Sequence, residues 1–217
     1  MFIEPENVWS ILKTLKPRVP LYTALFFRLK YLVFEAEAFR LPDNVAVVDI
    51  ETTGLDHKRD RMLTLGIYRS DRITIYQLLF GKDLREYSIV KRAIEDLKPL
   101  KVYAWYKDFE EKWLGLNGLH ELQIYNFEMK DRSIQIKGLE SEITGSNVPL
   151  AWREWREKGD ICMVLAIVQR NYFDLLTEAA SLVRFPLHAP RTLLISSPEE
   201  EEEEYEEDYY DEEEEEW

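Results

Sequence analysis

The sequence predicts an α/β domain in which helices cover a mixed five-stranded sheet, and three observations support this fold class. A β-branched run at residues 45–51 ends at a Thr-Thr-Gly turn, as a buried strand does. Two more apolar runs follow it closely, and beyond residue 84 strand-like and helix-like segments alternate. Because closely spaced strands pair antiparallel and strand–helix–strand units pair parallel, this order predicts a mixed sheet flanked by helices.

The expected elements follow from apolar periodicity and from the residues that interrupt it. We expect strands at 45–51, 61–69, 72–80, 101–105 and 122–128, and helices at 84–97, 109–116 and over most of 138–184. Ser70 and Asp71 supply a tight turn between the second and third strands, and Pro99 ends the first of these helices.

Residues 1–43 predict an N-terminal helical extension. One helix is expected at Glu6–Leu15 and a second at Leu21–Phe39, with a break at Pro17 and Pro20 between them. The second helix is rich in Leu, Phe and Tyr, so we expect it to pack against the main domain. Binding to a membrane surface or to a partner is the alternative.

The main domain is expected over residues 44–189, followed by an acidic tail over 190–217. The formal net charge is −14, but 15 of the 42 acidic residues lie in 199–217, so the remainder carries 27 acidic against 28 basic residues. Such a self-repelling tail is expected to be disordered. It could recruit a basic protein partner, occupy the substrate groove as a polyanion, or serve solubility alone.

Cysteine content and hydropathy narrow the protein class. Cys162 is the single cysteine, which excludes an internal disulfide framework and a cysteine-based zinc site. The most apolar stretch, Leu21–Phe34, is interrupted by Arg28 and Lys30, and no signal peptide pattern precedes it. We therefore expect a cytoplasmic protein that does not enter the membrane.

Two carboxylates at the end of the first main-domain strand indicate a metal site. Asp49 and Glu51 are two residues apart, so their side chains leave the same face of the strand. Their repulsion and lost hydration are costly unless a cation or hydrogen bonds compensate. A pair of divalent ions ~3.5–4 Å apart would do so, and such pairs are widely used for phosphodiester hydrolysis.

The same segment resembles a known motif. Asp49-Ile-Glu51-Thr-Thr-Gly54-Leu55 is similar at all seven positions to the first motif of the DEDD 3′–5′ exonucleases, Asp-x-Glu-Thr-Thr-Gly-Leu. The resemblance extends over residues 44–184 and implies a ribonuclease-H-like fold.

The second motif is looser. Phe109-Glu110 resembles the usual Phe-Asp at the start of a short helix, with Glu in place of Asp. Asp108 is the competing candidate. Alternatively, Asp108 caps this helix and Glu110 only favours its dipole.

The third motif lies on the last predicted helix. Asn171-Tyr-Phe-Asp174-Leu resembles the Tyr-Asn-x-x-Asp-Leu pattern of one stand-alone branch, with Arg170 in place of Tyr. Most such enzymes carry a water-orienting His or Tyr four or five residues before the last Asp, where this chain has Arg170 and Gln169. The group that orients the attacking water is therefore left open.

The resemblance implies a two-metal exonuclease acting on the 3′ end of single-stranded DNA or RNA and releasing nucleoside 5′-monophosphates. The implied catalytic and metal-binding residues, for two Mg²⁺ or Mn²⁺ ions, are Asp49, Glu51, Glu110 and Asp174. The implied substrate contacts are Thr52, Thr53, Gly54, Leu55, Arg170 and Asn171. Base stacking is expected from aromatic side chains, for which the candidates are Trp105, Tyr106, Trp152 and Trp155. Trp152 and Trp155 are three residues apart, and packing is the alternative for these two.

The alternative is a catalytically weak or inactive ribonuclease-H-like adaptor that binds nucleic acid and recruits a partner through its acidic tail. The departures in the second and third motifs keep this alternative open, whereas four retained acids favour an enzyme.

Overall fold

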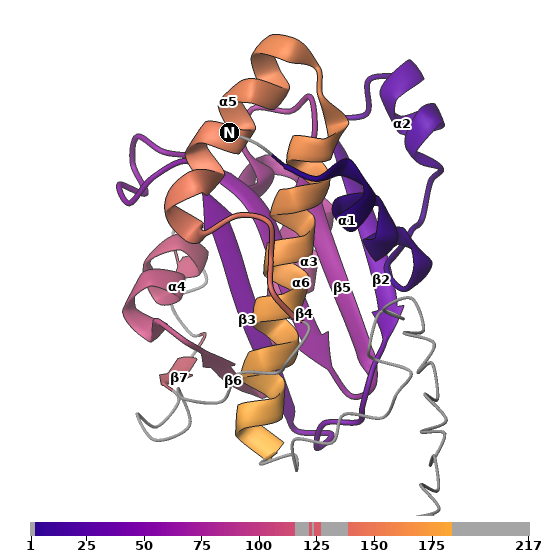
Figure 1. Ribbon diagram of the computed structural model, residues 1–217. Coiled ribbons are helices and arrows are strands. Elements are labelled where there is room, and N and C mark those ends of the chain that lie inside the picture. Colours follow the sequence, from indigo (N-terminus) through magenta and orange to yellow (C-terminus); the bar gives the residue numbers. More distant parts are fainter. Residues whose placement is uncertain (1–2, 116–121, 123, 127–138, 184–217) are drawn as a thin grey trace, which may run out of the picture.

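The computed structural model describes residues 3–115, 122, 124–126 and 139–183 (Figure 1). Its centre is a seven-stranded sheet in the order β1-β2-β5-β4-β3-β6-β7. The strands are β1 (Lys16–Pro17), β2 (Tyr31–Glu37), β3 (Val45–Thr52), β4 (Met62–Arg69), β5 (Arg72–Leu78), β6 (Lys101–Ala104) and β7 (Ile124–Asn126). Neighbours from β1 to β3 pair antiparallel, and β3–β6 and β6–β7 pair parallel. The predicted α/β class with a mixed sheet is confirmed, but the sheet has two more strands than expected.

Helices flank this sheet. They are α1 (Pro5–Ser10), α2 (Leu21–Phe26), α3 (Ser88–Glu95), α4 (Lys107–Leu114), α5 (Val148–Lys158) and α6 (Ile161–Val183), with short 3₁₀ helices η1 (Ile11–Lys13), η2 (Leu84–Glu86) and η5 (Gly145–Asn147). Figure 1 shows the long helix α6 running across β3, β4 and β5, with α1 and α5 packed beside it. Most of α6 is apolar and buried, so it forms the centre of the core on this face.

A glycine lets α6 approach the sheet closely. Gly66 of β4 lies opposite Asp49 of β3, on the face that α6 covers. A Cβ atom at Gly66 would come within 2.2 Å of Asn171 Oδ1 and 2.6 Å of Leu175 Cδ1. The absent side chain therefore allows α6 to bring Asn171 and the residues one turn after it against β3.

The predicted helix at Leu21–Phe39 is wrong in its second half. Helix α2 ends at Phe26, Arg28 turns the chain with a φ of 49°, and Tyr31–Glu37 forms strand β2. All seven residues of β2 pair with β5, and Lys16–Pro17 pairs with β2 as β1. The expected helical extension thus contributes two strands to the sheet, because pairing with β5 outweighs the local helical pattern.

The other predicted elements lie close to their expected ranges. The helix at Glu6–Leu15 corresponds to α1 and η1, and residues 138–184 contain α5 and α6. Among the described residues, no helix is long and apolar enough to cross a membrane. The acidic tail over 190–217 lies outside the part of the chain that the structure describes.

Candidate metal centre

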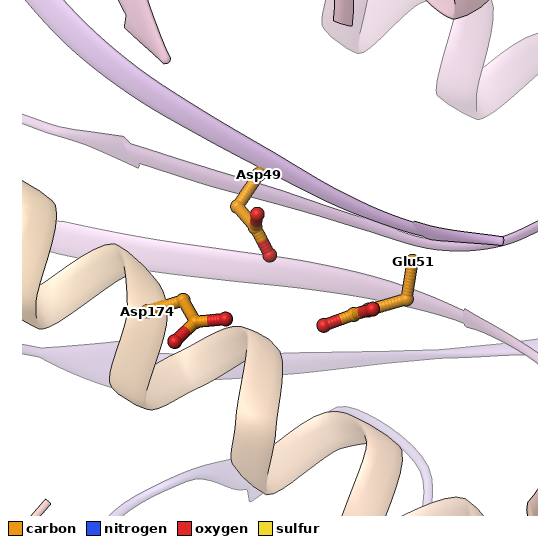
Figure 2. A group of neighbouring side chains, drawn as sticks. All are labelled: Asp49, Glu51 and Asp174. Carbon is orange, nitrogen blue, oxygen red and sulfur yellow. The ribbon is translucent and has the colours of Figure 1, made fainter. Parts of the chain in front are cut away.

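Three carboxylates meet where α6 crosses the end of β3. Asp49 and Glu51 leave the same face of β3, and Asp174 reaches them from α6 (Figure 2). One oxygen of each lies within 4.8 Å of the oxygens of the other two. The predicted first and third motifs therefore come together in space.

Asp49 is held by a neighbour on α6. The Asn171 side-chain amide donates to Asp49 Oδ2 at 2.6 Å and to the Asp49 backbone carbonyl at 3.1 Å. Asn171, which was predicted to contact substrate, is fully buried in the structure, and its amide orients Asp49. Burial raises the pKa of Asp49 well above its usual range, and the carboxylates of Glu51 and Asp174 raise it further.

Arg170 bridges the other two carboxylates. Its Nε lies 2.9 Å from Glu51 Oε1, and its second terminal nitrogen lies 2.8 Å from Asp174 Oδ2. Burial raises the pKa of Glu51 to about 8, although Arg170 opposes this effect. Burial likewise raises the pKa of Asp174, and Arg170 opposes that increase. The positive charge of Arg170 therefore offsets part, but not all, of the free-energy cost of burying these carboxylates close together.

Asp108 and Glu110 differ in burial and in their position relative to the cavity. Both lie in the first turn of α4, but Asp108 is exposed, whereas Glu110 is 2% exposed and borders the same cavity as the three carboxylates. Burial raises the pKa of Glu110 to about 8, and the nearby charge of Glu51 adds to this shift. Glu110 lies beside the three-carboxylate group but is not one of its members.

Glu178 is a fifth acid that the sequence analysis missed. It follows Asp174 by four residues on α6, so both face the cavity, and only 3% of it is exposed. Burial raises the pKa of Glu178 well above its usual range, with contributions from Glu110 and Asp174. The available signal was an acid one turn after Asp174 in an otherwise apolar helix.

The cavity at this site has a volume of about 460 Å³. Of the residues predicted to contact substrate, Thr52, Leu55 and Arg170 line it. Leu55 is 79% exposed at its rim, and Thr52 is buried and donates to the Gly54 carbonyl.

Thr53 and Gly54 shape the loop behind this wall and do not line the cavity. Thr53 Oγ1 accepts from the Arg61 backbone amide, and a Cβ at Gly54 would meet Asp60 Oδ2 at 2.4 Å. Their observed role is therefore to fold the turn after β3.

The predicted stacking residues divide into two groups. Trp105 and Tyr106 line the cavity, together with Phe109. Trp152 and Trp155 are 5% and 4% exposed, and the Trp155 indole donates to the Leu79 carbonyl in the core. These two residues therefore pack in the core, which is the alternative that their spacing left open.

The residues present fit a hard divalent cation. The candidate ligands are all carboxylate oxygens, the donors that Mg²⁺ and Mn²⁺ prefer. Glu110 Oε2 and Glu178 Oε2 are buried, and neither accepts a hydrogen bond from the described residues. Buried acids without partners are costly, so the site has both the donors and the energetic reason to bind a cation.

Comparison with known proteins gives a partial family match and a relative. Residues 46–129 match the sequence model of the RNase_H superfamily. An uncharacterized protein of Methanocaldococcus jannaschii is 25% identical over 150 residues, covering 53% of this chain and 80% of that protein.

Two solved structures are also similar. The family B DNA polymerase of Pyrobaculum calidifontis aligns with a TM-score of 0.48 and 15% identity over 68% of this chain, which spans 25% of the polymerase chain. A structure described as the apo form of a nuclease aligns with a TM-score of 0.35 and 12% identity, over 76% of this chain and 79% of that one. By sequence, the segment that carries Asp49, Glu51 and Glu110 is similar to the RNase H superfamily.

Proposed function

We propose that this protein is a metal-dependent 3′–5′ exonuclease that hydrolyses single-stranded DNA or RNA to nucleoside 5′-monophosphates. The observation that carries the proposal is the convergence of Asp49, Glu51 and Asp174 within 4.8 Å of one another in an open cavity. The sequence match of residues 46–129 to the RNase_H superfamily supports the same chemistry.

Asp49, Glu51 and Asp174, with Glu110 beside them, would hold two Mg²⁺ or Mn²⁺ ions. Bound divalent ions supply Lewis-acid stabilisation of charge on the reacting phosphate, which is the main requirement of phosphodiester hydrolysis. Asn171 keeps Asp49 in place through its two hydrogen bonds. Because the carboxyl pKa values are raised, the acids must lose protons as the ions bind.

The size and the lining of the cavity support the proposal that the substrate is the end of a single strand. Its volume of about 460 Å³ suits a small ligand such as a terminal nucleotide, since small-molecule sites measure ~300–1,000 Å³. Trp105, Tyr106 and Phe109 form part of its wall, and aromatic faces stack on unpaired bases regardless of sequence. The direction of cleavage, from the 3′ end, is proposed from the resemblance of Asp49–Leu55 to the DEDD motif.

The test uses single-stranded DNA and RNA labelled at the 3′ or the 5′ end, incubated with Mn²⁺, Mg²⁺ or EDTA. We expect metal-dependent shortening from the 3′ end. Asp49→Asn should reduce its rate by more than about 100-fold, because even residues that only support metal ligands typically contribute 10–100-fold.

The adaptor alternative gives a different result in the same experiment. It requires that the labelled strand be bound but never shortened in either metal. Internal cuts in place of stepwise shortening would retain a nuclease but contradict the exonuclease assignment.

A further inference from the structure

The guanidinium of Arg170 is ion-paired with two of the three candidate metal ligands. Its Nε and a terminal nitrogen contact Glu51 Oε1 and Asp174 Oδ2 at 2.9 and 2.8 Å. These contacts bridge two different carboxylates of the three-carboxylate group. Arg170 is therefore an internal cation placed at the candidate metal centre.

The surroundings of Arg170 are built to accommodate this position. Gly145 of η5 faces the guanidinium, and a Cβ atom there would lie 3.3 Å from its terminal nitrogen. Burial lowers the pKa of Arg170, but Glu51, Asp174 and Asp49 outweigh this effect and raise the pKa above its ordinary value. The charge is thus permanent and held by the acids around it.

Metal ions and Arg170 make competing demands on the same atoms. A carboxylate oxygen that is ion-paired with a guanidinium must give up part of that interaction to coordinate a cation. Without any cation, however, the acids would repel one another in a buried site. Among the described residues that line the cavity, Arg170 is also the single basic side chain.

We propose that Arg170 is a built-in competitor of the metal: it neutralises Glu51 and Asp174 in the metal-free protein and is displaced from them when a divalent ion binds. The displaced guanidinium remains on the cavity wall, where a phosphate of the nucleic acid would replace the lost carboxylate partners. Metal and phosphate binding are then positively coupled through one side chain. This inference rests on the proposed function for its metal, not for its cleavage direction.

The test is calorimetric titration of Mn²⁺ into the full chain without nucleic acid. We expect Arg170→Gln to bind Mn²⁺ tighter than wild type by on the order of tenfold or more, since the two ion pairs of Arg170 no longer oppose binding. Arg170→Lys, which keeps the charge but loses the two-pronged geometry, should lie between them. Arg153→Gln removes an exposed arginine of α5 and should match wild type.

Two further measurements distinguish a role of Arg170 as a competitor of the metal from a role in positioning the metal ligands. In EDTA, Arg170→Gln should melt at a lower temperature than wild type, and Mn²⁺ should raise its melting temperature by more. Adding thymidine 5′-monophosphate should tighten Mn²⁺ binding by wild type and not by Arg170→Gln. If the glutamine variant does not fold, Arg170→Lys carries the comparison.

The inference is overturned if Arg170→Gln, or Arg170→Lys in its place, binds Mn²⁺ with equal or weaker affinity than wild type. Weaker binding would make Arg170 a support that positions the ligands. If wild type itself binds no Mn²⁺, the proposed metal centre fails as well. If wild type binds Mn²⁺ and the Arg170 variants bind it with the same affinity, the competitor role alone is contradicted and the proposed function is unaffected.

Discussion

At the scale of single residues, the first turn of α4 offers a matched pair of acids. Asp108 and Glu110 are two positions apart, yet Asp108 is exposed and Glu110 is buried at the cavity. Glu110→Gln should slow metal-dependent shortening at least tenfold, because a neutral amide is a weaker ligand than a carboxylate. Rates on a 5′-labelled strand in Mn²⁺ measure the effect, with Asp108→Asn as the control that should remain active.

The free energy of unfolding distinguishes a role of Glu110 as a metal ligand from a structural role. At pH 9 in EDTA, Glu110→Gln should be at least as stable as wild type, because it removes a buried charge without changing the side-chain volume. A variant that lost both activity and stability would instead identify Glu110 as a structural residue. Urea unfolding at that pH gives the comparison.

The sequence predicted the acids of the site better than their neighbours. Asp49 and Glu51 share a strand face by simple alternation, and Asp174 was identified through the resemblance of its segment to the third motif. The ion pairs of Arg170 and the burial of Glu178 depend on where α6 crosses β3. That crossing is a tertiary property, and no local spacing encodes it.

At the scale of elements, the central strands and the two last helices could be predicted, but the N-terminal strand β2 could not. Tyr31–Glu37 continues the apolar composition of α2, and a helix accounts for it equally well locally. Its strand conformation depends on seven pairings with β5, about forty residues later in the chain. β-propensity is set largely by such neighbours, which explains the error.

Gly66 determines how closely α6 approaches the sheet, and its replacement tests this geometry. A Cβ in Gly66→Ala would overlap Asn171 Oδ1, which cannot move without disturbing the hydrogen bonds to Asp49. We expect a loss of about 1–3 kcal/mol in the free energy of unfolding, together with reduced nuclease activity. Urea titration in EDTA measures the first effect.

Gly115→Ala is the matched control for that experiment. Gly115 follows α4, its backbone is in the right-handed helical region, and none of the described residues has an atom within 4 Å of its Cβ position. We expect this variant to be as stable as wild type or slightly more so. Equal stability of the two alanine variants would show that α6 adjusts to a side chain at Gly66 without cost.

At the scale of the whole molecule, the buried acids link stability to pH and to metal. Burial raises the pKa of Glu110, which is not ion-paired with Arg170, to about 8, from 4.5. Between these values the folded protein binds protons that the unfolded chain has lost. The contribution of this carboxyl to stability in EDTA is therefore fully present below pH 4.5 and falls as the pH rises towards 8, by about 1.4 kcal/mol per pH unit.

A divalent ion should reverse this trend, because it binds the deprotonated carboxylates and replaces their protons. We expect the melting temperature in EDTA to fall between pH 5 and 8, and the increase caused by Mn²⁺ to grow over the same range. Glu110→Gln removes one of the titrating groups and should make the decline in EDTA shallower. A metal-free melting temperature that stays constant over this range would mean that Glu110 remains ionised in the folded protein, with its charge compensated by solvent.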